Sequence, residues 1–188
     1  PIQLSAERLE MKLTGKLQAT KKKNMVKSVK TIVDQVDAMK RLVNEFRDYA
    51  RLPAAELQPL DLNALVTEVL HLYEHENAAV PVETQLDARC PPIAGDAQQL
   101  RQVVHNLVQN AQDSTEQMRA GTSEPIPPVR ISTRWSESSR RVRLTVSDSG
   151  GGFPEHILQR AFEPYVITNS LVTGLGLAVV KKIADEHG

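Results

Sequence analysis

The segment from Asp96 to about Met118 constrains the fold most, because its apolar residues recur at helical spacing, i, i+3, i+4 and i+7. These apolar residues are Leu100, Val103, Val104, Leu107, Val108 and Ala111. Asp96 stands directly before the segment and is a favourable N-cap residue. The pattern therefore predicts an amphipathic helix that packs its apolar face into a core.

A second stripe on this helix consists of Asn106, Asn110 and Asp113. At roughly 100° per residue it flanks the apolar arc, which places the three side chains at the margin of the core. A buried polar group without a partner costs on the order of 1–3 kcal/mol, and a ligand or a metal ion could supply the partners. An isolated helix more often carries such a stripe as a solvated shoulder, so other motifs must decide.

The length of 188 residues fits one core-forming domain with an appendage. The 23 basic and 23 acidic side chains cancel, which gives no support for binding to nucleic acid. Cys90 is the only cysteine, so a disulfide framework and a cysteine-rich zinc site are excluded, and a reducing cytoplasm is favoured. No apolar run approaches bilayer length, so we expect no membrane contact by this segment, although the full protein could be an inner-membrane sensor anchored upstream.

Residues 1–52 predict two helices with narrow apolar seams, joined as a hairpin. The seam of the second helix contains Val29, Ile32, Val36, Met39, Val43, Phe46 and Ala50, which alternate spacings of three and four. Two antiparallel helices cannot bury such seams alone, so a second copy would complete a dimeric four-helix bundle. Packing against the rest of the chain is the alternative. Pro53 and Pro59 then mark residues 53–60 as a linker.

Residues 61–188 alternate helical and strand patterns. A helix is expected from Leu62, with Asp61 or Asn63 as its N-cap, and strands are expected over 80–86, 129–135 and 141–147. If the last strand continued to Asp148, the Asp148 carboxylate would point to the buried face and would need strong donors. An exocyclic amino group of a purine is such a donor.

Two glycine motifs accompany these elements. Gly150 and Gly152 follow Asp148 and would let the backbone approach a flat ring, although an Asp-x-Gly sequence alone more often makes a turn. The run Thr173-Gly174-Leu175-Gly176-Leu177 opens a helix that ends near Gly188, and free N–H groups at a helix start suit phosphate oxygens. Each motif is weak evidence by itself.

Together, four ordered motifs resemble the N, G1, F and G2 boxes of sensor histidine kinases, which belong to the gyrase, Hsp90, histidine kinase and MutL ATPase superfamily. The motifs are Asn106-x-x-x-Asn110-Ala, Asp148-x-Gly150-x-Gly152, Phe162-Glu-Pro-Tyr165 and Gly174-Leu-Gly176-Leu-Ala. The segment from Pro1 to Leu52 is similar to the dimerisation helices of the nitrogen-regulation, NtrY-type kinases. The resemblance thus spans nearly the whole chain.

The resemblance implies an α/β sandwich of the Bergerat type, in which helices cover one face of a mixed sheet and 61–188 forms the ATP-binding domain. It implies Mg²⁺ on Asn110, with Asn106 orienting the ion's water shell or the phosphates, and these two asparagines as the catalytic residues. Asp148 would bind the adenine amino group beside Gly150 and Gly152. The remaining nucleotide-contacting residues implied by the motifs are Asp113, Phe162, Thr173, Gly174, Leu175, Gly176 and Leu177. Phe162 to Thr173 would form the lid.

The sequence departs from that family in four respects. The acceptor-histidine box is absent, and none of the 5 histidines, His71, His75, His105, His156 and His187, has its context. Val172 stands where a glycine is usual, and the lid contains no Lys or Arg. Family members continue with further strands, so the domain is expected to be truncated at the C-terminus.

The leading hypothesis is the dimerisation and ATP-binding core of a two-component sensor histidine kinase. It would transfer the ATP γ-phosphoryl group to a histidine upstream of this chain, and from there to the receiver domain of a response regulator. A non-catalytic dimeric scaffold with a nucleotide-sensing pocket is the alternative. A hydrolysing ATPase is disfavoured, because an amide at Asn106 cannot accept a proton from water.

Overall fold

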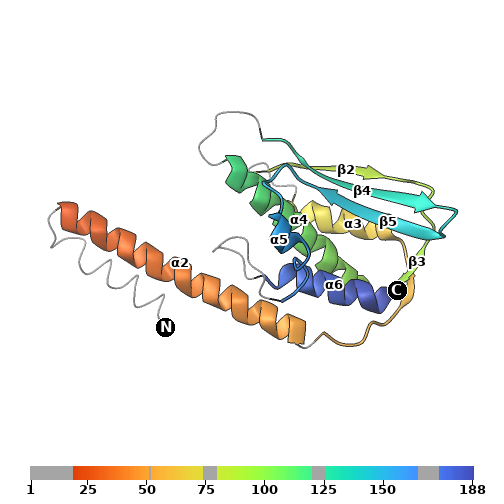
Figure 1. The fold of residues 1–188 in the computed structure, drawn as a ribbon, viewed down its shortest axis with the longest axis horizontal. Coiled ribbons are helices and arrows are strands. Elements are labelled where there is room, and N and C mark those ends of the chain that lie inside the picture. The colour runs from red at the N-terminus through yellow and green to blue at the C-terminus, as the bar shows by residue number, and fades with distance from the viewer. Residues whose placement is uncertain (1–18, 51, 74–79, 120–125, 165–173) are drawn as a thin grey trace. The chain divides into compact units, whose positions relative to one another are not determined.

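The computed structural model describes residues 19–50, 52–73, 80–119, 126–164 and 174–188, and element labels follow Figure 1. The described part falls into two compact units. The first contains α2 (Ala19–Ala50), and the second contains residues 52–164 and 174–188. The first predicted helix of the hairpin lies outside the described residues.

The helix α2 follows the predicted seam, and most of that seam is exposed in a single chain. Exposed fractions are 48% for Ile32, 68% for Met39, 62% for Val43 and 49% for Phe46, whereas Val29 is buried. The four-helix bundle stays a prediction. Among the helices that the structure describes, none has the length and apolar content to cross a membrane.

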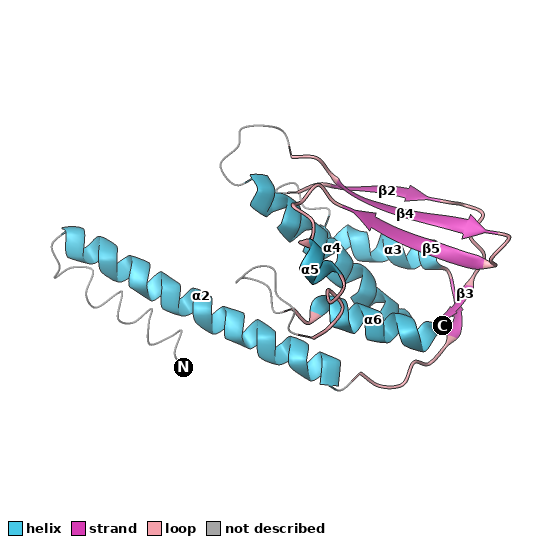
Figure 2. Cartoon of the chain, viewed as in Figure 1, coloured by secondary structure: helices cyan, strands magenta, loops and turns pink. Residues whose placement is uncertain are grey.

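The second unit is built on a mixed sheet, as predicted. Its strands are β2 (Val82–Leu86), β4 (Val129–Ser136) and β5 (Arg141–Ser147), in the order β2-β4-β5 (Figure 2). The pair β2 and β4 is parallel, and the pair β4 and β5 is antiparallel. Along β4, Val129 and Ile131 are buried while Arg130 and Arg134 are exposed, so one face of the sheet is apolar and the other is polar.

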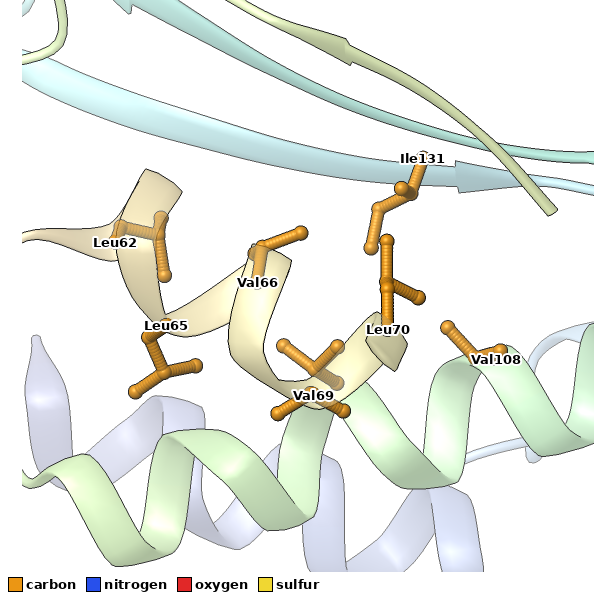
Figure 3. Close-up of a cluster of buried hydrophobic side chains, with 8 residues drawn as sticks. Leu62, Leu65, Val66, Val69, Leu70, Val108 and Ile131 are labelled. Carbon is orange, nitrogen blue, oxygen red and sulfur yellow. The ribbon is translucent and has the colours of Figure 1, made fainter. Parts of the chain in front are cut away.

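Helices cover the apolar face, with α3 (Leu62–Leu70) and α4 (Ala97–Arg119) beneath the sheet and α6 (Gly176–His187) against α4 (Figure 1). The short helices η1 (His71–Tyr73) and α5 (Glu155–Leu158) complete the described helices. The buried cluster between α3, α4 and the sheet contains Leu62, Leu65, Val66, Val69, Leu70, Val104, Val108 and Ile131 (Figure 3). This core fixes α4 against the sheet.

Both predicted helix starts are capped as expected. The Asp61 carboxylate accepts a hydrogen bond from the Ala64 N–H at 3.0 Å. The Asp96 carboxylate accepts from the N–H groups of Gln99 and Gln98 at 3.1 and 2.9 Å, and hydrogen bonds from the Gln99, Glu56 and Gln98 N–H groups lower the pKa of Asp96. The backbone N–H of Asp96 donates to His187 Nε2 at 2.9 Å, which joins the start of α4 to the end of α6.

The stretch 53–60, expected as a linker, contains the short strand β1 (Gln58–Leu60), which pairs with β3 (Ile93–Gly95) in a separate two-stranded sheet. Side chains also hold this stretch, because Glu56 N–H donates to Asp96 and Gln99 Nε2 donates to the Pro53 carbonyl. Strands of three residues are too short to show a periodic pattern in sequence.

Candidate functional site

The polar face of α4 meets the start of α6. Asn106 Nδ2 donates a hydrogen bond to the Gly176 carbonyl at 3.3 Å. A Cβ at Gly176 would lie 3.5 Å from Asn110 Nδ2 and 3.8 Å from Asn110 Oδ1. Both asparagines therefore face the first turn of α6, where glycine leaves space in front of the Asn110 amide. Among the described residues, the Asn110 side chain has no hydrogen-bond partner.

The start of α6 is suited to an anion. Gly174 has a φ of 71°, which favours glycine, and the buried Leu175 occupies the N-cap position without a side-chain cap. The first N–H groups of a helix have no partner within the helix, and they carry the positive end of its dipole. The motif thus places N–H donors beside Asn106 and Asn110.

The other glycine motif lies one turn further along the same face of α4. The Ser149 N–H donates to Thr115 Oγ1 at 3.4 Å. A Cβ at Gly150 would lie 1.8 Å from Ser114 Oγ, so only glycine fits this close approach. Because Asn106, Asn110 and Ser114 are spaced by four residues, one face of α4 touches both glycine motifs.

The expected burial of Asp148 is wrong. The strand β5 ends at Ser147, one residue before Asp148, so the alternation of faces does not extend to this side chain. Asp148 is exposed, and its Oδ1 accepts a hydrogen bond from the Gly150 N–H at 2.8 Å. This local turn fixes the carboxylate at the edge of the loop that packs on α4.

Asp113 differs from the two asparagines in its surroundings. Its carboxylate accepts from Gln109 Nε2 at 2.9 Å, and its charge acts on Tyr73. Ser114, which sequence reasoning passed over, makes the contact with the 148–152 loop. The spacing of four from Asn106 to Asn110, continued once more, would have pointed to it.

Tyr73 and His105 support α4 next to this face. The Tyr73 hydroxyl and His105 Nδ1 share a hydrogen bond of 2.6 Å, and the two rings lie 5.9 Å apart. Burial, helped by the negative charge of Asp113, raises the pKa of Tyr73 to about 12. Tyr73 therefore stays protonated at neutral pH and available as a donor.

For the remaining predicted site residues, the structure gives backbone conformation or exposure alone. Gly152 has a φ of 67° and open space around its Cα, while Leu177 follows Gly176 in the first turn of α6. Phe162 is 50% exposed, and Thr173 lies outside the described residues.

The side chains present fit a magnesium nucleotide better than a metal held by protein alone. No group of three His, Cys, Asp or Glu side chains that could hold a metal occurs in the described part of the chain. Mg²⁺ commonly takes one or two protein oxygens and fills its shell with water and phosphate oxygens. The Asn110 amide, beside the α6 N–H groups, offers that kind of incomplete ligand set.

Residues 95–188 match the family described as histidine kinase-, DNA gyrase B-, and HSP90-like ATPase, and the chain belongs to this family. It is 33% identical over 192 residues to an NtrY-like sensor histidine kinase of Rickettsia bellii, covering 100% of this chain and 29% of that protein. It is 32% identical to the nitrogen regulation protein NtrY of Azorhizobium caulinodans, covering 100% of this chain and 24% of that protein. The chain thus spans less than a third of either relative.

A solved structure extends the similarity to the fold. The full-length ShkA structure in complex with AMPPNP matches with a TM-score of 0.65 and 25% identity, over 98% of this chain and 40% of that chain. The predicted ATP-binding fold, with a mixed sheet and helices, is therefore confirmed.

Proposed function

We propose that this chain is the ATP-binding and dimerisation core of a sensor histidine kinase of the nitrogen-regulation type. The observation that carries the proposal is the face of α4 on which Asn106 and Asn110 lie against Gly176 while Ser114 lies against Gly150. Family membership and similarity to NtrY-like kinases along the whole chain support it.

Different residues bind different parts of Mg-ATP. The N–H groups at the start of α6 bind phosphate oxygens, and Asn110 holds Mg²⁺ through its amide oxygen. The ion supplies positive charge that offsets the charge of the phosphates. Asp148, at the edge of the loop, accepts from the adenine amino group, and the 148–152 backbone lies beside the ring. Most of the segment expected to form the lid, residues 165–173, lies outside the described residues.

The chemistry of Asn106 favours transfer to a protein side chain over hydrolysis. Its amide orients the ion's water shell or the phosphates, and it is already held by the Gly176 carbonyl. An amide takes no proton from water at neutral pH, so the site contains no general base at this position. The γ-phosphoryl group then passes to a histidine upstream of this chain. Catalysis rests on positioning and charge neutralisation.

The partners follow from the same assignment. The exposed seam of α2 pairs with a second copy, and residues 1–52 form the dimer bundle. The receiver domain of a response regulator takes the phosphoryl group from the histidine. The chain acts in the cytoplasm, as the cytosolic part of an inner-membrane sensor.

Calorimetry on the chain tests nucleotide binding. We expect ATP to bind more tightly with Mg²⁺ than with EDTA, and we expect Asn110→Ala to remove this difference. Gln109→Ala, which removes an exposed amide that is bonded to Asp113 and not to the start of α6, is the matched control and should retain it. Equal affinity with and without Mg²⁺ in the wild-type chain would contradict the role of Asn110.

Phosphotransfer needs the chain extended by its natural upstream helix. With γ-labelled ATP, we expect acid-labile label on that helix, and transfer of the label to the receiver domain. Nucleotide binding without label transfer would instead support a dimeric scaffold that senses nucleotide. Release of inorganic phosphate without labelled protein would support a hydrolysing ATPase.

A further inference from the structure

The outer face of the β2-β4-β5 sheet, away from α3 and α4, holds a polar hollow outside the nucleotide site. Its volume is about 420 Å³, and the residues that line it include Gln85, Arg89, Ser132, Arg134, Arg143 and Thr145. Nothing in the proposed kinase chemistry uses these side chains.

Two of its arginines stand in an unfavourable arrangement. Arg134 on β4 and Arg143 on β5 are directly opposite each other in the register. Like charges in opposed positions destabilise a sheet. Within the part of the chain that the structure describes, neither arginine forms an ion pair. The acidic residue that lines the hollow, Asp87, is paired with Arg89, so no lining carboxylate is paired with Arg134 or Arg143.

Another cross-strand pair on the same face of the sheet joins opposite charges. Arg130 on β4 is directly opposite Glu83 on β2, and its Nε lies 3.5 Å from a Glu83 carboxylate oxygen. The outer face thus has one cross-strand pair that is neutralised and one that is not. An incoming anion would complete the second pair.

The third arginine of the hollow is held in place. Arg89 Nε and a terminal guanidinium nitrogen each lie 3.0 Å from a different oxygen of Asp87. Asp87 is itself anchored, because its carboxylate accepts from the Trp135 N–H at 3.3 Å. The Arg89 side chain remains 75% exposed, so it presents an oriented guanidinium at the rim.

Charge and spacing together define the ligand. Arg141 is exposed two residues before Arg143, so both lie on the outer face of β5, about 6.6 Å apart along the strand. Alternate side chains of an extended peptide have the same spacing. The hydroxyl groups of Ser132 and Thr145 add neutral hydrogen-bonding groups to the hollow.

We propose that this hollow docks an extended acidic segment of a partner protein, whose carboxylates bind Arg134 and Arg143. A nucleic acid is the less fitting ligand, since the 23 basic and 23 acidic residues of the chain give no broad positive field. The surface is independent of the nucleotide site.

Fluorescence anisotropy on the full chain tests the proposal with a labelled decapeptide of alternating Glu and Ser. We expect saturable binding that weakens from 50 to 200 mM salt, and no binding of the peptide with Gln in place of Glu. Arg143→Glu should weaken binding at least tenfold while raising the thermal midpoint, because it places opposite charges across from each other at this pair. A purely structural residue would not lose binding and gain stability together.

Arg130→Gln is the matched control on the same strand face and should bind within twofold of the wild-type chain. Arg134→Gln gives a second test if Arg143→Glu folds poorly, and unchanged Mg-ATP binding reports an intact domain. The proposal is overturned if the Gln peptide binds equally well or if neither hollow variant weakens binding. The proposal is also overturned if Arg130→Gln weakens binding as much as Arg143→Glu and Arg134→Gln do. It is overturned as well if an oligonucleotide of equal charge binds more tightly than the Glu peptide.

Discussion

Gly150 and Gly176 lie against the same face of α4, yet a methyl group at each would meet different surroundings. At Gly150 the added Cβ would overlap Ser114, with Oγ at 1.8 Å and Cβ at 2.6 Å. At Gly176 the nearest atoms are those of Asn110 and Asn106 at ordinary contact distances, beginning at 3.5 Å. Glycine is therefore needed for packing at the first position, and for space beside the asparagines at the second.

Gly176→Ala should separate binding from stability. Alanine is well tolerated in a helical turn, so the free energy of unfolding should change by less than about 0.5 kcal/mol or rise slightly. The methyl group would occupy space in front of Asn110, and we expect Mg-ATP affinity to fall roughly tenfold, about 1.4 kcal/mol. Calorimetry and urea unfolding measure the two quantities. A loss of stability with unchanged affinity would place the nucleotide elsewhere.

Gly150→Ala should instead destabilise the domain, by roughly 1–3 kcal/mol, because the 148–152 loop must move away from α4. Ser114→Gly removes the two nearest overlapping atoms, at a cost of about 1 kcal/mol in the helix, and leaves only Asp148 Oδ1 at 2.8 Å. The double variant should therefore be more stable than the sum of the two single effects predicts. A double-mutant cycle in urea measures this coupling. Additive effects would show that Ser114 and Gly150 are not in contact.

At the scale of elements, α4 connects the packing of the second unit to the site. Its apolar face contacts α3 and the sheet through Val104 and Val108, while its asparagine face meets α6. Its start is held by the bond between the Asp96 N–H and His187, and its third turn by the bond between Tyr73 and His105. Positions on α4 are thus fixed from several sides.

The Tyr73 contact gives a pH dependence with a definite sign. Because its pKa is raised from 10.0 to about 12, native Tyr73 keeps its proton where unfolded tyrosine loses it. The contribution of Tyr73 to the free energy of unfolding is fully present below pH 10 and is lost between about pH 10 and 12. Half-burial limits the effect to roughly 1 kcal/mol. Between pH 9 and pH 11, urea unfolding should show a larger loss of unfolding free energy for the wild-type chain than for Tyr73→Phe. Equal losses would contradict this role of Tyr73.

Elements with a clear hydrophobic periodicity could be predicted from the sequence. Features that depend on contacts between residues distant in the chain could not. The apolar period and cap of α4, the alternation of β4 and the order of the motifs are local properties that periodicity reveals. The β1–β3 pair has three residues per strand, and Asp148 is exposed because β5 stops one residue earlier. The contact of Ser114 with Gly150 exists only once α4 and the loop are packed.

At the scale of the whole molecule, α2 carries an apolar stripe that is exposed in the described part of the chain. Ile32, Met39, Val43 and Phe46 are spaced by seven, four and three residues, and each is about half exposed or more. Full burial of a large apolar side chain contributes about 1.5–3 kcal/mol, so this stripe is a substantial driving force for association. A second copy would bury it with the same residues on both sides, as two-fold symmetry requires.

Met39→Glu combined with Val43→Glu should therefore convert a dimer into a monomer. Each carboxylate would enter an apolar seam, where an unpaired charge is strongly unfavourable. Light scattering after gel filtration should give twice the chain mass for the wild type and the single mass for the double variant. Lys30→Glu, which places a carboxylate on the opposite, exposed side of α2, should remain dimeric. Because the nucleotide face lies on α4 and α6, the monomer should still bind Mg-ATP. A wild-type monomer at high concentration would show that the seam packs against this chain instead of a second copy.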